Sequence, residues 1–500
     1  MGIRLVSIGS AVPGIGKVPG RQYTNKEMII EHLLPHLDPS SFRPRPELKT
    51  HNLQTFIQSM FELSENKDEA KKHSKYVDNA LYNILFPYVY GISSYISPLR
   101  RKFDVGFEKA AKRFTRHIGV QVRGIYSDPN DKHPTNTLAI HAGLDTINEA
   151  KKTLDTAEYS FDVKKIDGLI CVSNTPDNVF PVHGKKIAQV LGIKARFYSN
   201  NQMACASIAD AICTTGQWFK ESKTCNVILI LASDVTSRLR QPENIKANPL
   251  QNLIFGDAAA GLIFVRMPGT GGITVSNIEL DNDAPDFYHR YAYTGDLDEV
   301  NDDFLQCGGK NDEYLKQFGD YESKVMANLV LRYLKTRNGK LDPNDKLILP
   351  EATSIIRSNG LKKLGDKIER EIKLHIVDSA VPTHGITGSP ATAIAWKQAI
   401  EKGHIKPEDR VTYFNVALSG LKCRVTVDPN AEEIFRLEDE EVGNEEPKNN
   451  LANGDMTYDF EKRLSPFVEL NGKPKQETII DRNQNTVLEQ AEKSRDEMKV

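Results

Sequence analysis

The run Asp167-Gly168-Leu169-Ile170-Cys171-Val172-Ser173 decides the fold, because it is a short apolar stretch closed by polar residues at both ends. Its length is typical of a strand that is buried on both faces. Helical periodicity follows at 183–191, a second strand pattern at 195–199 and a second helix at 205–221. Strands that alternate with helices in this way predict an α/β architecture with largely buried sheets.

The same order of elements occurs a second time further along the chain. The first series ends with strand patterns at 226–233 and 258–265. The second series is predicted as strands at 272–280, 346–349, 374–377, 411–416 and 422–427, with helices at 321–336, 355–364 and 390–402. Because the order repeats although the residues do not, we predict two similar halves stacked on each other, 1–268 and 269–428.

Two stretches interrupt this pattern and a third follows it. Residues 31–107 predict a helical insertion with many aromatic residues, either a cap packed on the main fold or a lid over an acyl-chain pocket. Residues 284–319 are polar and acidic and predict a surface loop. Residues 429–500 hold few apolar side chains, so we predict a polar, weakly ordered C-terminal extension.

The composition excludes several classes of protein. With 65 Lys and Arg against 67 Asp and Glu, the net charge of −2 gives no general attraction to nucleic acid or to an anionic membrane. No apolar run reaches the ~18 residues of an integral membrane segment. The six cysteines form neither a metal-binding pair nor a disulfide framework. We therefore expect a cytoplasmic protein with reduced thiols and no metal site.

Cys205 is the best candidate for a nucleophile. It lies in Ala204-Cys205-Ala206-Ser207, where a strand pattern gives way to a helix. A thiol at the first turn of a helix faces the positive end of the helix dipole, which favours the thiolate and predicts a lowered pKa. The alternative is a small buried residue that only fills space in the core.

Several motifs occur together in one order. They are Asp167 to Asp177, Phe180-Pro181, Ala204-Cys205-Ala206, Ala232-Ser233-Asp234, Phe255-Gly256-Asp257-Ala258-Ala259-Ala260-Gly261 and His384-Gly385. In this order they resemble β-ketoacyl-ACP synthase III of the thiolase superfamily, over residues 3 to about 20 and 113–427. The resemblance implies a thiolase-like five-layered αβαβα sandwich of two similar halves, usually a homodimer.

For Cys205 the resemblance implies attack on an acyl thioester and a covalent acyl intermediate. Sulfur is a soft nucleophile that suits this carbonyl. The resemblance also places an oxyanion-binding loop at Ala417-Leu418-Ser419-Gly420, so Ser419 and Gly420 are expected to bind substrate. It places Phe180 in the acyl pocket of the partner subunit, with plain core packing as the alternative.

The His and Asn that the family sets beside its Cys are both replaced in this chain. The His position falls in Leu349-Pro350-Glu351-Ala352-Thr353, where Pro350 or Glu351 takes its place. The Asn position falls at Ile386, which would line the substrate site without donating a hydrogen bond. Because decarboxylation needs donors for the enolate oxygen, the replacements argue against ordinary malonyl condensation.

Two residues are candidate bases in place of the missing pair. Glu351 would activate an acceptor toward the acylated Cys205 if burial raised its pKa, and the alternative is a surface or helix-capping carboxylate. His384 lies two residues before Ile386. It is a second candidate base, with a loop histidine satisfied by its neighbours as the alternative.

These observations predict an acyltransferase that carries an acyl group on Cys205 and passes it to an acceptor, in fatty-acid-like or specialised-metabolite synthesis. Its partners would be acyl-CoA or acyl carrier protein, used as thioester substrate without a further cofactor. It would form a homodimer, or a heterodimer with a related synthase. Two alternatives stay open: a catalytically degenerate subunit that partners an active synthase, and a decarboxylative condensing enzyme with an atypical triad.

Overall fold

The computed structural model describes residues 1–28, 115–116, 118–128, 130–155, 161–177, 184–239, 253–276, 279–281, 312–417 and 420–438. They belong to one compact unit, Met1–Asn444. The predicted insertion 31–107 lies outside the described residues. The predicted surface loop 284–319 is wrong in its last part, because residues from Asp312 onward already form the helix α10.

The first sheet is built around the segment 167–173. This segment forms β4 (Gly168–Val172), in which all five residues are buried. β4 pairs in parallel with β5 on one side and with β6 on the other. The sheet order is β1-β7-β6-β4-β5, with β7 antiparallel to both of its neighbours. The other strands are β1 (Gly2–Ala11), β5 (Phe197–Asn201), β6 (Val227–Asp234) and β7 (Ala258–Met267).

The second sheet has the order β10-β11-β12-β8-β13, and β9 pairs with β12. Its strands are β8 (Gly272–Ser276), β9 (Glu279–Leu280), β10 (Asp345–Ile348), β11 (Arg410–Val416), β12 (Leu421–Asp428) and β13 (Phe435–Glu438). The strand predicted at 374–377 is reduced to one bridge between Leu347 and Ile376, because the chain turns immediately after a helix there. β13 pairs with β8, so the sheet continues into the segment that begins at Pro429.

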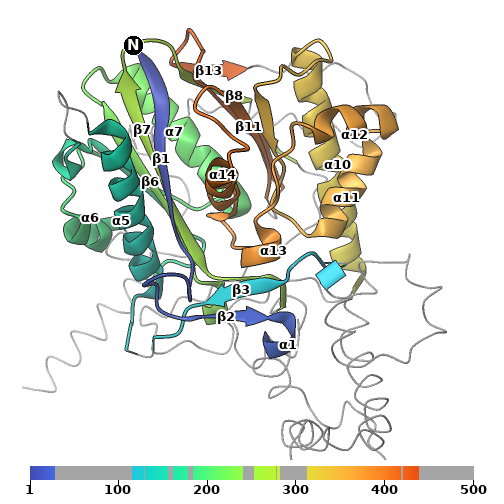
Figure 1. Cartoon of the computed structure of the whole chain (residues 1–500), viewed down its shortest axis with the longest axis horizontal. Helices are drawn as coiled ribbons and strands as arrows, with labels where there is room; N and C mark the ends of the chain where they lie inside the picture. Colours follow the sequence, from blue (N-terminus) through green and yellow to red (C-terminus); the bar gives the residue numbers. More distant parts are fainter. Residues whose placement is uncertain are drawn as a thin grey trace, which may run out of the picture. The chain divides into compact units, whose positions relative to one another are not determined.

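Helices cover the sheets in layers (Figure 1). α5 and α6 pack on the first sheet, α7 and α14 contact strands of both sheets, and α10 packs on the second sheet with α11 against it. The helix bounds are α1 (Asn25–Glu27), α5 (Pro134–Leu154), α6 (Gly184–Leu191), α7 (Ser207–Glu221), α10 (Asp312–Thr336), α11 (Ser354–Lys363), α12 (Asp366–Lys373), α13 (Val381–His384) and α14 (Ala391–Glu401). The order helix, sheet, helix, sheet, helix confirms the predicted five-layered α/β sandwich. A separate ribbon consists of β2 (Arg21–Thr24) and β3 (Val122–Ile125).

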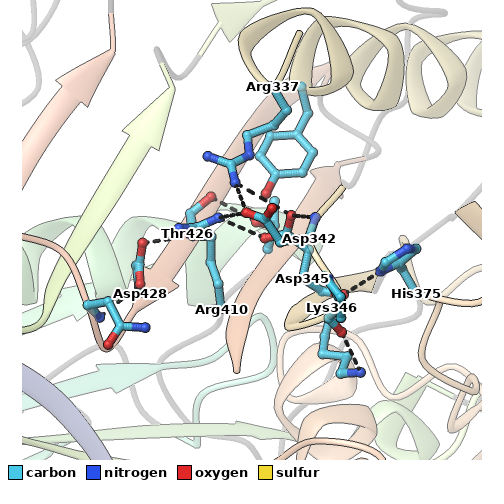
Figure 2. A network of polar contacts seen from close by, with 12 residues as sticks. Arg337, Asp342, Asp345, Lys346, His375, Arg410, Thr426 and Asp428 are labelled. Atoms are coloured by element: carbon cyan, nitrogen blue, oxygen red, sulfur yellow. Dashed lines mark hydrogen bonds and ion pairs between the residues drawn. The ribbon is translucent and has the colours of Figure 1, made fainter. Parts of the chain in front are cut away.

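A polar network fixes one end of the second sheet (Figure 2). The Arg410 guanidinium donates from Nη1 to Asp345 at 2.9 Å and from Nε to Asp428 at 2.7 Å. The neighbouring Arg337 donates to Asp342 at 2.5 Å. Because Asp345, Arg410 and Asp428 come from β10, β11 and β12, the network holds three strands in register.

Candidate active site

Cys205 lies in a one-turn 3-10 segment, Ala204–Ala206, between β5 and α7. Ala204 has a φ of 48°, a left-handed backbone conformation that is strained for residues other than glycine. The Ser207 hydroxyl holds this turn, since it accepts from the Met203 N–H and donates to the Ala204 carbonyl, each at 2.7 Å. The turn therefore presents Cys205 at the start of a largely buried helix.

The Cys205 thiol keeps its proton at neutral pH. The residue is half-buried, whereas Cys171, Cys213, Cys225 and Cys423 are buried. Burial of the sulfur raises the pKa of Cys205 to about 12, and the charges of Glu322 and Asp234 act in the same direction. The backbone N–H of Cys205 lowers the pKa but is outweighed. The predicted lowering at the helix start is therefore wrong, because burial and two nearby carboxylates oppose it.

Glu322 is a buried carboxyl group whose charge raises the pKa of Cys205. It lies on α10 and is 7% exposed. Burial raises the pKa of Glu322 to about 8, and no other cause contributes to the shift. Because an ordinary glutamate has a pKa near 4.5, this shift brings proton exchange by the Glu322 carboxyl close to neutral pH.

Asp234, at the end of β6, joins the two halves of the molecule. Its carboxylate accepts hydrogen bonds from the backbone and side-chain amides of Asn174 at 2.6 and 3.0 Å. It also accepts from the backbone N–H and the hydroxyl of Ser389, both at 2.7 Å. Asn174 follows β4, whereas Ser389 precedes α14, so a structural role for Asp234 agrees with these contacts.

The Glu351 side chain is buried, and both of its carboxylate oxygens accept hydrogen bonds. Its Oε1 accepts from Arg357 at 2.8 Å, and its Oε2 accepts from the Ser379 hydroxyl and the Ala380 N–H, each at 2.8 Å. Burial raises the pKa of Glu351, while Arg357 and these hydrogen bonds oppose the rise. The carboxylate thus fastens the start of α13 to α11, and its action as a base stays a prediction.

His384 and Ile386 lie at the end of α13 and just beyond it. The His384 Nδ1 lies 2.7 Å from the Thr383 hydroxyl and 3.2 Å from the Gln398 side-chain amide. Burial lowers the pKa of His384, so the imidazole is neutral at physiological pH. The Ile386 N–H donates to the Ile254 carbonyl at 2.9 Å, and its carbonyl accepts from the Gly256 N–H at 3.1 Å. These bonds fix the loop against the entry to β7.

Gly420 closes the turn between β11 and β12. Its φ of 79° requires glycine, and its N–H donates to the Ala417 carbonyl at 2.9 Å. This N–H is therefore used inside the turn, and the predicted role of Gly420 in substrate binding stays a prediction. Ser419 and Phe180 lie outside the described residues, so their predicted roles stay predictions.

Comparison with known proteins shows which synthases the chain is similar to. No protein-family profile matches the chain. The β-ketoacyl-[acyl-carrier-protein] synthase III of Wolbachia pipientis is 25% identical over 270 residues, which is 54% of this chain and 78% of the relative. That of Clostridium perfringens is 22% identical over 298 residues, covering 59% of this chain and 83% of the relative. Over these ranges the chain is similar to β-ketoacyl-[acyl-carrier-protein] synthase III.

Solved structures agree in fold with this chain. The 3-oxoacyl-[acyl-carrier-protein] synthase III of Aquifex aeolicus superposes with a TM-score of 0.54 at 14% identity, covering 85% of this chain and 100% of that one. AbyA1, a tetronic acid condensing enzyme, gives a TM-score of 0.56 at 14% identity, covering 85% of this chain and 99% of that one. At these identities the likeness establishes the fold alone.

The predicted site residues of the chain do not all gather at one place. Glu351, His384 and Ile386 gather around α13, and in the described ranges no hydrogen bond joins them to Cys205. The charges that raise the pKa of Cys205 are instead those of Glu322 and Asp234. Glu322 was not a candidate in the sequence analysis. The sequence does contain a sign of it: Glu322 is an acidic residue at helical spacing from Val325 and Met326, so it falls on the apolar face of the predicted helix.

The close contact between Gly256 and the loop after α13 gives a prediction for the stability of the chain. A Cβ at Gly256 would lie 2.2 Å from the His384 carbonyl oxygen, so Gly256→Ala must push that loop away. We expect a loss of about 1–3 kcal/mol in the free energy of unfolding, measured by urea denaturation. The control is Ser358→Ala, at an exposed position on α11, because Gly192→Ala would introduce strain at a positive φ. If Gly256→Ala were as stable as Ser358→Ala, the close contact would be contradicted.

Among the described residues, no helix combines the length and the apolar character needed to cross a bilayer. In the same residues, His, Cys, Asp and Glu side chains form no group of three or more that suits a metal ion.

Proposed function

We propose that the chain is an acyltransferase that takes an acyl group from acyl-CoA or acyl carrier protein onto Cys205 and passes it to an acceptor. The observation that carries the proposal is the half-buried Cys205 on a strained turn before α7, in a chain similar to β-ketoacyl-[acyl-carrier-protein] synthase III. The substrate supplies the thioester, and the proposal includes no further cofactor. Association into a homodimer is part of the same proposal.

A cavity beside α10 supports a phosphate-bearing substrate. It has a volume of about 710 Å³, and its lining includes four basic side chains, Lys324, Arg332, Lys363 and Lys422, together with Asp281 and Asp320. Arg332 and Lys422 both pair with Glu279, and Lys422 also pairs with Asp281. Val325 and Leu329 contribute apolar surface to the same cavity. Both CoA and the prosthetic group of a carrier protein join phosphate to a long, partly apolar arm, and cations beside apolar side chains suit that combination.

The chemistry of the site supports acyl transfer over decarboxylation. By the resemblance, Pro350 or Glu351 stands at the position of the catalytic His, and Ile386 stands at the position of the Asn. Neither Pro350 nor Ile386 has a side-chain donor for an enolate oxygen. Glu351 accepts hydrogen bonds with both oxygens. We therefore expect little CO₂ release from a malonyl thioester, even when Cys205 carries an acyl group.

The proposal is tested by incubating the full chain with acetyl-, octanoyl- and palmitoyl-CoA and with the same acyl groups on a carrier protein. Intact-mass measurement is expected to find one acyl group per chain for at least one substrate. Radioactive malonyl-CoA in a parallel reaction measures CO₂ release. Absence of an adduct with every thioester would contradict the proposal and favour the degenerate-subunit alternative, for which co-purification with an active synthase is the direct test.

A further inference from the structure

A strand from the segment beyond Asp428 extends the second sheet. β13 pairs in parallel with β8 along its whole length. The stretch that leads into β13 is fastened as well, since the Gly271 N–H donates to the Ala431 carbonyl at 2.8 Å. β13 lies beyond residues 113–427, over which the motifs resemble β-ketoacyl-ACP synthase III. The strand is therefore an addition to the part of the chain that carries the resemblance.

The Phe435 side chain of this strand packs against α7. Phe435 is 5% exposed. A Cβ at Gly216, inside α7, would lie 2.1 Å from Cδ2 of the Phe435 ring, so the ring occupies the space that a larger residue would fill. Lys220, one turn further along the same face of the helix, has its Nζ 6.0 Å from the ring centroid. The ring therefore covers one turn of α7.

The helix α7 links this contact to the turn that holds Cys205. It starts at Ser207 and is continuous through Gly216, about 13 Å further along its axis. Ser207 also makes the two hydrogen bonds of 2.7 Å that hold the turn. The turn Ala204–Ala206 runs directly into the helix, so a shift or rotation of α7 acts on Cys205 without an intervening loop.

The turn needs support because its backbone is strained. Ala204 has a φ of 48°, and a residue other than glycine keeps this conformation only where its surroundings hold it in place. If α7 lost its contact with β13, relaxation of Ala204 would turn the Cys205 sulfur away from its present position. A displacement of about 1 Å is enough to slow a reaction that depends on orientation by about 10²-fold.

We propose that Phe435 is a positioning residue for Cys205, acting through α7, an inference that rests on the proposed function. In this role Phe435 contacts neither the sulfur nor the substrate. Its ring fixes the helix, the helix fixes the turn, and the turn sets the direction from which the sulfur attacks the thioester carbonyl. The strand β13 is then part of the machinery of acyl transfer and more than an appendage of the fold.

The first test measures single-turnover acylation of the full chain with octanoyl-CoA and acetyl-CoA, over a range of concentrations, for wild type, Phe435→Leu and Phe435→Ala. Rates are divided by the folded fraction from circular dichroism. The maximal rate is expected to fall about 10-fold in Phe435→Leu and up to about 10²-fold in Phe435→Ala. The concentration for half-maximal rate is expected to change less than about twofold, because no group that binds substrate is altered.

The matched control is Arg436→Ala, at the exposed neighbouring position of the same strand. This variant is expected to keep the wild-type rate. Leucine retains part of the apolar volume of Phe435, so Phe435→Leu decides the test if Phe435→Ala does not fold.

A double-mutant cycle with Gly216→Ala tests the route through α7. The added methyl group crowds the ring, so Gly216→Ala alone is expected to shift the helix and to lower the acylation rate. Once Phe435→Ala has removed the ring, the methyl group has room. The double variant is therefore expected to react about as fast as Phe435→Ala alone. Losses that multiply would mean that the two residues do not act through one contact, and the proposal would be wrong.

Alkylation of Cys205 by iodoacetamide, located by peptide mapping, gives a readout that does not depend on acyl transfer. Relaxation of the turn exposes the half-buried sulfur, so Phe435→Leu is expected to alkylate several-fold faster than wild type. Arg436→Ala is expected to alkylate at the wild-type rate.

The outcomes separate the two claims. If no CoA thioester acylates the wild type, the proposed function fails; faster alkylation of Phe435→Leu then still supports the role of Phe435, and equal alkylation overturns it. If the wild type is acylated and Phe435→Leu changes neither the maximal acylation rate nor the alkylation rate, only the role of Phe435 is overturned. A loss of stability with an unchanged rate per folded molecule would overturn it as well, because it would show a purely structural contact.

Discussion

Cys205→Ala is expected to abolish acyl transfer, with turnover reduced about 10⁴-fold or more. The reason is that the acyl group travels on this sulfur, and no other cysteine among the described residues is exposed enough to replace it. The measurement is the rate of thioester consumption by the full chain, with the acyl-CoA that labels the wild type fastest.

Cys213→Ala is the matched control for this prediction. Cys213 lies further along α7 and is buried. The Cys213→Ala variant is therefore expected to keep turnover close to the wild-type value. Unfolding midpoints of the two variants show whether a loss of rate comes from chemistry or from stability. Turnover that survives in Cys205→Ala would exclude the covalent intermediate.

Asp234→Ala is expected to destabilise the fold by about 3–5 kcal/mol. The substitution removes the acceptor for the Asn174 and Ser389 amides and for the Ser389 hydroxyl, of which the Ser389 groups are buried. Because Asn174 and Ser389 belong to different halves, the loss also loosens the contact between the two sheets. Urea denaturation followed by circular dichroism measures the free energy of unfolding.

Asp378→Ala provides the comparison for Asp234→Ala. The Asp378 side chain is 66% exposed and pairs with Lys402 at 3.5 Å, so its removal is expected to change stability by less than about 0.5 kcal/mol. A similarly small effect at Asp234 would mean that the carboxylate does not join the halves. Asp234→Asn, which keeps the shape, is expected to fall between the two.

The sequence predicted the elements that bury regular apolar patterns. β4, α7 and α14 lie where periodicity placed them, because burial of such patterns leaves few alternatives. The short segment 374–377 was wrong as a strand, since one bridge to Leu347 is all that the turn after α12 allows. β13 was not predicted because its pairing with β8 depends on a strand more than 150 residues away, which no local pattern reveals.

The candidate site was predictable in part. The position of Cys205 follows from a local transition from strand to helix, so sequence patterns find it. Its pKa does not, because the carboxylates of Asp234 and Glu322 come from other parts of the chain and oppose the helix start. The partners of Glu351 likewise lie up to 29 residues away, so its engagement with Arg357 and Ala380 becomes visible only in three dimensions.

The central claim is that the sulfur of Cys205 carries the acyl group. The most direct test is to quench the full chain during turnover with an acyl-CoA, digest it and locate the acyl group by tandem mass spectrometry. The account predicts that the group is found on the peptide that contains Cys205 and on no other. An acyl group on a different cysteine, or turnover without any acylated peptide, would contradict it.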